Sequence, residues 1–218
     1  MAEGEVKSVR VTSRISEVDS EQWDACAGSD NPFVSHAFLD ILEQSEAASI
    51  ESGWLPQHLL LEDKSGQLIG AVPCYLKNHS YGEYVFDWGW ADAFQRAGGK
   101  YYPKLQVSVP FSPVTGPRLL VRPCTNAKEI RGLLINALRA LANQHEVSSL
   151  HITFCEKEER DQLEDQNFLK RLGQQFHWHN RGYDTFDDFL RALNSRKRKS
   201  IRKERQIANR AAEIKVLT

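Results

Sequence analysis

The stretch from Asn126 to Leu141 predicts an amphipathic helix, and its position in the chain limits the fold more than any other feature. Its apolar residues recur at i, i+3, i+4, i+7, i+8 and i+11, which places them in one stripe along a helix: Ile130, Leu133, Leu134, Ala137, Leu138 and Leu141. Asn126 and Glu129 have the spacing of a capping box at its start. The segment Leu150–Phe154 follows with alternating apolar residues and predicts a strand. A helix that connects strands indicates a layered α/β domain.

Shorter patterns complete the predicted order of elements. Strands are predicted at Val6–Val11, His58–Asp63, Gly66–Leu76, Tyr84–Trp88, Leu105–Val109, Leu119–Val121 and Gln174–Asn180. Helices are predicted at Ser20–Cys26 and Asn31–Ser45, with Ser20 and Ser35 as caps, at Lys157–Gly173, and from Phe186 to about Ala212. Antiparallel strands come first and β-α-β alternation follows. We therefore expect an α/β (α+β layered) fold, in which helices flank a mixed sheet and a long basic helix follows.

The composition excludes several classes of protein. Of the 218 residues, 41% are hydrophobic and 26% charged, which is typical of a globular chain. No apolar run approaches the roughly 20 residues of a membrane-spanning helix, and the N-terminus carries no visible export or import signal. The four cysteines lie far apart in apolar surroundings, which indicates buried thiols and predicts a cytoplasmic protein: Cys26, Cys74, Cys124 and Cys155.

Positive charge is concentrated near the end of the chain. Seven of the ten residues from Arg196 to Arg205 are Lys or Arg. The longer segment Arg196–Lys215 holds nine basic residues and two Glu, a net charge of +7, so the rest of the chain carries −8 to give the total of −1. This distribution predicts one local anion site rather than general binding of nucleic acid, and no DNA partner is expected.

The basic residues would form two stripes on a helix. Arg198, Arg202 and Arg205 fall on one side, and Lys199 and Lys203 form a neighbouring stripe. Such stripes could hold a diphosphate or phosphodiester through charge-assisted hydrogen bonds, and the predicted phosphate-binding residues are Arg196, Arg198, Lys199, Arg202 and Lys203. The alternative is a solvated helix face.

The aromatic stretch around Asp87 predicts a different kind of site. Asp87 lies between Phe86 and Trp88, with Trp90 close behind. Burial among aromatic rings disfavours the ionised carboxylate, so a raised pKa would make Asp87 a proton acceptor near neutral pH. We therefore predict Asp87 as a catalytic base, with Trp88 and Trp90 lining the substrate site. The alternative is an aspartate that braces its loop above buried tryptophans.

Further polar residues are predicted to line the same cleft. Tyr102 is a candidate general acid, and Tyr101 and Lys104 are candidate substrate ligands beside it. The motif "PVTGPR" contributes Gly116 and Arg118, of which Arg118 is predicted to bind substrate. A tyrosine that only packs its ring is the alternative for Tyr101 and Tyr102.

Histidines supply the remaining candidates. On a strand, His177 and His179 would share one face, but no third ligand is identifiable, so no metal site is predicted. A polar wall of a substrate site is expected instead, from His151, Gln175, His177 and Arg181. The chain has no G-x-S-x-G, Walker A, G-x-G-x-x-G or H-E-x-x-H motif.

Several unusual stretches follow one another in order from Asn31 to Gln206: "NPFVSHAFLDILEQS", "LIGAVPCYLKNHSYGEYVFDWGWADAF", "GGKYYPKLQVSVPFSPVTGPRLL", "SSLHITF", "GQQFHWHNRGY" and "FLRALNSRKRKSIRKERQ". In these stretches the chain resembles the FemAB-like group of predicted N-acyltransferases within the GNAT superfamily, which is sometimes labelled peptidoglycan-biosynthesis-like. Members of this group usually have two GNAT-like halves. The resemblance therefore implies a GNAT-like domain over residues 1–190, a basic connecting helix over 191–212 and the start of a second half at 213–218.

The resemblance also implies an activity. An acyl or aminoacyl group would move from an activated donor to a small-molecule primary amine, without a covalent enzyme intermediate or a tightly bound cofactor. The Gly-rich pyrophosphate turn of acetyl-CoA-using relatives is missing, so the phosphate-bearing donor stays open between an acyl-CoA and an aminoacyl-tRNA. The rival hypothesis is a non-catalytic protein whose basic helix holds RNA, including tRNA, or another polyanion.

Overall fold

The computed structural model describes residues 8–124 and 126–211. Its chain forms two compact units, Met1–Leu172 and Gly173–Thr218, and each is described by itself. The expected start of a second half, residues 213–218, lies outside the described residues.

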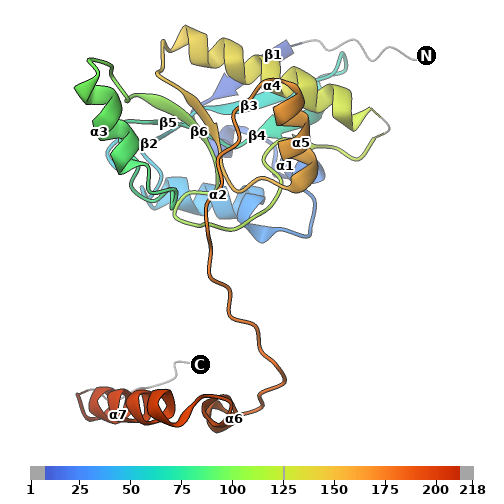
Figure 1. Ribbon diagram of the computed structural model, residues 1–218. Helices are drawn as coiled ribbons and strands as arrows, with labels where there is room; N and C mark the ends of the chain where they lie inside the picture. The colour runs from blue at the N-terminus through green and yellow to red at the C-terminus, as the bar shows by residue number, and fades with distance from the viewer. Residues whose placement is uncertain (1–7, 125, 212–218) are drawn as a thin grey trace. The chain divides into compact units, whose positions relative to one another are not determined.

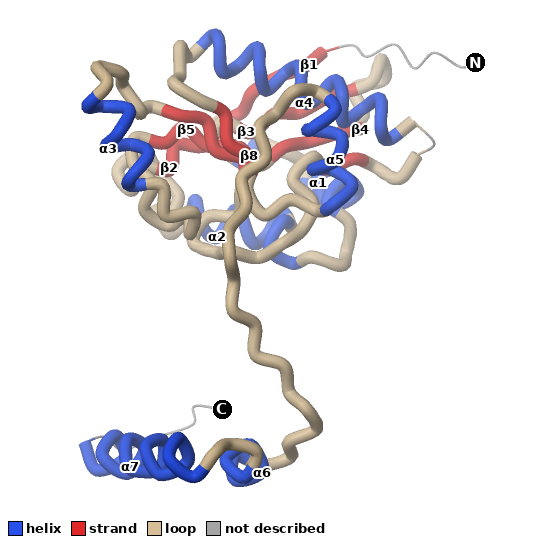
Figure 2. The backbone as a smooth tube through the Cα atoms, in the orientation of Figure 1, coloured by secondary structure: helices blue, strands red, loops and turns tan. Residues whose placement is uncertain are grey.

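Two four-stranded sheets form the centre of the first unit (Figures 1 and 2). The first sheet is antiparallel throughout, in the order β1 (Ser8–Thr12), β3 (His58–Glu62), β4 (Leu68–Val72) and β7 (Leu120–Val121). The second sheet is mixed, in the order β2 (Trp54–Pro56), β5 (Cys74–Lys77), β6 (Lys104–Val107) and β8 (Leu150–Ile152), with β8 parallel to β6. The segment predicted as one strand, Gly66–Leu76, is divided between the sheets at Pro73, which has no N–H for a ladder bond.

Helices cover both faces of the first sheet, as Figure 1 shows for α4 and α2. On one side, α4 (Ala127–Gln144) packs its apolar stripe against Leu59 and Leu61 of β3. On the other side, α1 (Ser20–Ala27) packs against Leu60, and α2 (His36–Gln44) follows the short 3-10 turns Ile15–Glu17 and Pro32–Val34. Successive side chains of β3 point to opposite faces of the sheet, so this strand contributes residues to both apolar layers. The predicted layered α/β fold with flanking helices is confirmed.

Three local predictions at helix starts have different outcomes. Ser35 caps α2 as predicted, since its hydroxyl accepts a hydrogen bond from the Phe38 N–H. Asp19, rather than Ser20, caps α1. The predicted capping box of α4 is wrong, because the Asn126 side chain makes no cap hydrogen bond.

Other element boundaries also differ from the predictions. Tyr84–Trp88 is not a strand, and Trp88 instead begins α3 (Trp88–Arg96). The predicted helix Lys157–Gly173 ends early as α5 (Lys157–Asp165), two residues before Asn167 at a φ of 64°. Residues 174–180 are not a strand. The pattern of alternating aromatic and polar residues there predicted a strand, but no neighbouring strand pairs with it among the described residues.

The second unit holds α6 (Phe186–Arg191) and α7 (Ser195–Ala211). One continuous helix was predicted here, and that prediction is wrong because the helix is interrupted at residues 192–194. Thr185 forms a capping box with Asp188 at the start of α6, and Leu190 is buried. Within the described residues, no helix is both long and apolar enough to cross a membrane.

Candidate active site

The two faces of the second sheet differ in chemistry. One face carries Leu105, Val107, Leu150 and Ile152 into the apolar core beneath α4. The other, which we call the polar face, carries side chains of the alternate residues. Its members are Trp54 of β2, Tyr75 and Lys77 of β5, Lys104 and Gln106 of β6 with the following Ser108, and His151 of β8 with the following Thr153.

Lys104 is the centre of the polar face. Its ammonium group is fully buried and donates hydrogen bonds to Ser80 Oγ at 2.8 Å, Glu83 Oε2 at 2.7 Å and Asp87 Oδ2 at 2.7 Å. Both carboxylates are also buried. Two buried carboxylates that share one ammonium are stabilised only while that cation is present, because an unpaired buried charge is costly.

The environment of Asp87 is the opposite of the predicted one. Burial raises the pKa of Asp87, but hydrogen bonds from Lys104, Ser80 and Tyr101 lower it more, to about 2. The Tyr101 hydroxyl donates to Asp87 Oδ2 at 2.7 Å. Asp87 therefore stays ionised at neutral pH and is a poor proton acceptor, so the reasoning that made it a base is wrong. The local sequence could not reveal Lys104 as its partner.

The predicted aromatic residues gather around this cluster. The Tyr102 hydroxyl hydrogen-bonds Ser80 Oγ at 2.8 Å, and the Tyr101 ring contacts both Tyr102 and His151. Trp88 and Trp90 are 42% and 66% exposed, so they are surface residues and not the core of a loop. The Arg171 guanidinium lies over the Trp90 ring at 5.7 Å.

Two further groups of the polar face have shifted pKa values. Burial lowers the pKa of Lys77 to about 7, with Glu83 acting against the shift and Lys104 adding to it. The Lys77 ammonium also lies 3.6 Å from the centre of the Trp54 ring. Burial, followed by Lys104, lowers the pKa of His151 to about 4, so this imidazole is neutral at pH 7.

The loop that supplies the two carboxylates has an unusual backbone. Tyr84 and Phe86 adopt φ angles of 59° and 49°, a left-handed conformation that costs non-glycine residues energy. Their side chains are exposed, while Glu83 and Asp87 on either side are buried. The strained turn therefore directs two acids inward, an arrangement common at functional sites.

Arg118 does not belong to this cluster. Its buried guanidinium donates to the backbone carbonyls of Thr153 at 2.9 Å, Pro117 at 3.0 Å and Val114 at 2.5 Å. The Glu159 carboxylate accepts hydrogen bonds from the Arg118 and Leu119 N–H groups. Arg118 braces the loop before β7, and its role as a substrate ligand stays a prediction.

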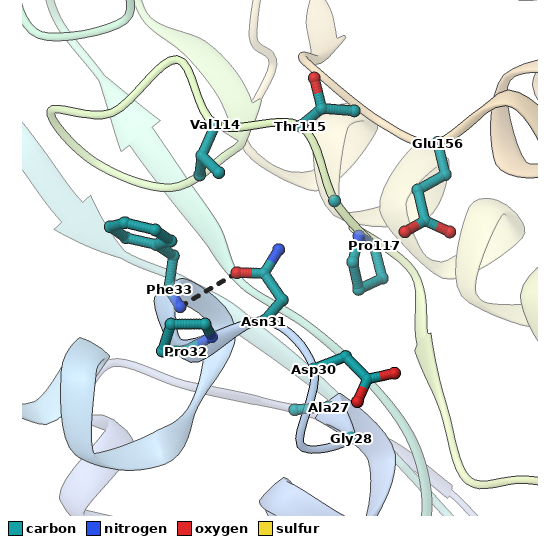
Figure 3. A pocket seen from close by; sticks show the side chains of 11 residues that line it. Ala27, Gly28, Asp30, Asn31, Pro32, Phe33, Val114, Thr115, Pro117 and Glu156 are labelled. Atoms are coloured by element: carbon teal, nitrogen blue, oxygen red, sulfur yellow. Dashed lines mark hydrogen bonds between the residues drawn. The ribbon is translucent and has the colours of Figure 1, made fainter. Parts of the chain in front are cut away.

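A separate open pocket of about 420 Å³ lies beside this loop (Figure 3). Its lining includes the carboxylates of Asp30 and Glu156 and the side chain of Asn31. The Gly116 N–H donates to the Phe154 carbonyl at 3.1 Å, and a Cβ on Gly116 would lie 2.0 Å from Asn31 Nδ2. This glycine serves close packing with Asn31, and the acidic lining does not favour a phosphate.

The other predicted residues lie in the second unit. Gln175, His177 and Arg181 are exposed, and His177 Nε2 lies 3.1 Å from Gln175 Oε1. Among residues 8–124 and 126–211, no group of three or more His, Cys, Asp or Glu side chains could hold a metal ion.

One basic stripe contacts other residues of the second unit. Its members are Arg198, Arg202 and Arg205. Arg198 donates to the Leu190, Arg191 and Leu193 carbonyls at the end of α6. Arg202 pairs with Asp187 at 3.6 Å, and Arg205 lies 4.1 Å from the centre of the Phe186 ring. Arg198 therefore caps the C-terminal end of α6 in this structure, and its phosphate role stays a prediction.

Three side chains of the basic segment remain on another stripe. Arg196, Lys199 and Lys203 are exposed and have the i, i+3, i+7 spacing of one helix face. Within the part of the chain that the structure describes, their side chains have no hydrogen bond or ion pair. These three are the remaining candidates for phosphate binding.

The sequence did not indicate Lys77, Ser80, Glu83 or Gln106 as residues of this site. One signal was present, since Lys104, Gln106 and Ser108 alternate with Leu105, Val107 and Val109. Alternation of this kind ordinarily indicates a solvent-facing side, and only the loops over the sheet make this side buried.

The Asp87→Asn substitution should reduce the loss of unfolding free energy that the protein shows at acidic pH. Because the folded-state pKa of Asp87 lies below its ordinary value of 3.8, its contribution is present above about pH 4 and is lost as pH falls toward 2. We expect wild-type protein to lose about 1–2 kcal/mol more than Asp87→Asn across that interval in urea unfolding. Asp92→Asn, at the exposed partner of Arg96, is the control. Equal acid slopes for wild type and Asp87→Asn would contradict the expectation.

The FemAB-like family, described as peptidoglycan biosynthesis/recognition, matches residues 14–218. The chain belongs to the FemAB-like family, and the resemblance seen in the sequence is confirmed. No match was found among curated proteins.

Solved structures of low identity are also similar. They include a ribosomal-protein-alanine N-acetyltransferase from Brucella melitensis biovar Abortus 2308, at 15% identity, a TM-score of 0.47, and coverage of 79% of this chain and 98% of that one. An acetyltransferase from Trypanosoma brucei has 12% identity and a TM-score of 0.46 over 79% and 99% of the two chains. An aminoglycoside antibiotic 6'-N-acetyltransferase from Acinetobacter baumannii has 13% identity and a TM-score of 0.44 over 80% and 99%.

Proposed function

We propose that this protein is an N-acyltransferase that moves an acyl or aminoacyl group from an activated donor to a primary amine. The observation that carries the proposal is the buried cluster of Lys104, Glu83, Asp87 and the two tyrosines on the polar face. Membership of the FemAB-like family supports the same class of activity. The donor class is a thioester such as an acyl-CoA or an ester such as an aminoacyl-tRNA.

In this proposal, the Glu83 carboxylate accepts the proton. Burial raises the pKa of Glu83, with Lys104 opposing the shift, so its carboxylate takes a proton more readily than that of Asp87. Glu83 Oε1 also has no hydrogen-bond partner among the described residues. Asp87 keeps a different role, since its fixed charge orients Lys104 and Tyr101.

Tyr102 is the proposed proton donor. Burial raises the pKa of Tyr102, so its hydroxyl keeps its proton at neutral pH. The hydroxyl is linked to Lys104 through Ser80, because both contact Ser80 Oγ at 2.8 Å. A leaving thiolate or alkoxide needs a donor of this kind.

The acceptor ammonium gives one proton to Glu83, and the resulting amine nitrogen forms a bond to the donor carbonyl carbon. The bond from that carbon to the leaving sulfur or oxygen then breaks, and the leaving atom takes the Tyr102 proton. The second amine proton replaces the proton lost by Tyr102, and Glu83 releases its proton to solvent.

Mass spectrometry of acyl transfer tests this proposal. The full chain would be incubated with acyl-CoA mixtures, or with aminoacyl-tRNA, and a panel of primary amines. We expect a new amide whose rate of formation falls about 10²–10⁴-fold in Tyr102→Phe, the usual contribution of a positioned general acid. Tyr84→Phe, at an exposed tyrosine, is the matched control. A product that forms equally fast in Tyr102→Phe would overturn the assignment.

The rival function receives one specific support. Arg196, Lys199 and Lys203 form an exposed basic face on α7, which could hold the phosphates of RNA or of the donor. A triple substitution to Ala should weaken RNA binding and make it less dependent on salt. Binding of RNA that is strong and salt-dependent, together with no acyl transfer, would favour the binding-protein hypothesis.

A further inference from the structure

Each of the two buried carboxylates around Lys104 uses only one oxygen. Glu83 Oε2 and Asp87 Oδ2 both accept from Lys104 Nζ at 2.7 Å. Glu83 Oε1 and Asp87 Oδ1 are equally buried and have no hydrogen-bond partner among the described residues. A buried acceptor without a donor is costly, and more so when it is charged. The cluster therefore has room in its hydrogen-bonding pattern for another donor.

Another unpartnered acceptor lies on β6, the strand that carries Lys104. Gln106 is two residues from Lys104 on β6, so both side chains lie on the polar face. Its amide nitrogen donates to Thr153 Oγ1 at 2.9 Å, whereas its Oε1 is buried without a partner in the described part of the chain. These three oxygens can only accept hydrogen bonds. The other buried atoms of the polar face without a partner among the described residues, Trp54 Nε1, Tyr75 Oη and Ser108 Oγ, can donate. A group that carries only donors matches the three oxygens.

We propose that Glu83 Oε1, Asp87 Oδ1 and Gln106 Oε1 receive the ammonium group of the acceptor substrate, which makes this face a selective site for primary ammonium compounds. A primary ammonium has three N–H donors and no acceptor. The inference rests on the proposed N-acyltransferase function, because it names the subsite for the acceptor of that reaction.

The charges of the cluster favour one additional cation. Glu83 and Asp87 supply two potential negative charges, and Lys104 supplies one positive charge between them. Lys77 is the second nearby cation, and its pKa of about 7 means that it readily loses its proton near neutral pH. A bound ammonium can thus take over the positive charge that Lys77 gives up.

The surroundings of Lys77 fix the direction of the pH dependence. Glu83 from the loop and Lys104 from β6 act on it, its ammonium contacts the Trp54 ring and the Tyr81 carbonyl, and His79 is the other titratable neighbour. A second cation should expel the Lys77 proton. Binding at pH 6 must release that proton, whereas binding at pH 8 need not. Affinity should therefore rise with pH while the ligand, with a pKa of roughly 10, stays charged.

Access to the site involves the loop that carries the two acids. Tyr81 and Trp88 are exposed and their rings contact each other at 4.8 Å beside this loop. Aromatic faces attract ammonium groups, so they provide a first contact before the cation reaches the buried oxygens. The acids are buried, so the loop must open for the ligand to enter.

Calorimetric titration of the full chain with methylammonium chloride tests the proposal without any acyl donor. Tetramethylammonium chloride at equal ionic strength is the ligand control, because it has the charge but no N–H donor. We expect saturable methylammonium binding, at least tenfold weaker binding of tetramethylammonium, and a Kd that falls about tenfold between pH 6 and pH 8.

Variants locate the binding. Glu83→Gln should weaken methylammonium binding at least tenfold, and Gln106→Met about threefold, whereas Glu158→Gln at an exposed acid should have no effect. Far-UV circular dichroism checks that each variant folds. If Glu83→Gln does not fold, Gln106→Met still tests the proposal. Equal binding of the two ligands, no saturable binding, or unchanged Kd in the folded Glu83→Gln or Gln106→Met variants would each overturn the inference. Binding without acyl transfer would instead refute the proposed function alone.

Discussion

Replacing Lys104 with Met should destabilise the chain by about 3–5 kcal/mol, the usual cost of removing one partner from a buried ion pair. Its ammonium is the hydrogen-bond partner of both Glu83 and Asp87, and all three side chains are buried. Methionine fills a similar volume but leaves two carboxylates without a cation. The free energy of unfolding in urea at pH 7 measures the effect.

The pH dependence of this variant identifies its cause. Without Lys104, the folded-state pKa values of Glu83 and Asp87 should lie above their unfolded values, so stability is retained at low pH and is lost as pH rises through them. The deficit should therefore be larger at pH 8 than at pH 4. The triple variant Lys104→Met, Glu83→Gln, Asp87→Asn should recover most of the loss at pH 8.

Lys157→Met provides the matched control. Lys157 pairs with Asp161 on the surface, where its side chain is 80% exposed, so its replacement should cost under about 1 kcal/mol. If Lys104→Met cost no more than Lys157→Met, the buried cluster could not be the organising feature of the polar face.

Replacing Arg118 with Met should have the next largest effect, a loss of about 3 kcal/mol. The guanidinium donates to three backbone carbonyls, and its removal leaves several buried acceptors unsatisfied, each at a cost of about 1–3 kcal/mol with incomplete additivity. Glu159 also loses the positive charge of Arg118, which favours its ionised form. Urea unfolding and the rate of proteolysis in the loop Val114–Pro117 measure the result.

The same experiment separates the observed role of Arg118 from the predicted one. A substrate ligand on a rigid scaffold can be replaced with little change in stability, typically within about 0.5 kcal/mol. A stable Arg118→Met protein with weakened substrate binding would therefore restore the sequence-based prediction. Arg118→Lys should recover only part of the stability lost in Arg118→Met. A single ammonium group cannot donate to all three carbonyls that the planar guanidinium contacts.

The candidate site was predicted in part. Asp87, Tyr101, Tyr102 and Lys104 were selected from one aromatic segment, and the structure brings them into direct contact. Neighbours in sequence often remain neighbours in space, so a short segment could indicate them. Glu83 and Lys77 were missed because their relation to Lys104 depends on the pairing of β5 with β6 and on a loop conformation.

The basic segment was also predicted in part. Its charge and its helical spacing were visible in the sequence, and α7 is the helix that they predicted. The sequence did not show which stripe is free. Arg198, Arg202 and Arg205 contact α6, a separate helix that ends before an interruption at residues 192–194, and the spacing did not reveal this interruption.

The sequence by itself determined the elements whose signals are local: the apolar stripe of α4, the cap of α2, the alternation along β6 and the density of charge in α7. The tertiary structure alone decided which alternating face is buried, which arginine braces a loop, and that the pKa of Asp87 is lowered instead of raised. The reason is that periodicity depends on residues a few positions apart. Desolvation, ion pairing and pKa depend on groups that only the folded chain brings within 3 Å of one another, such as Lys104 and Asp87 at 2.7 Å.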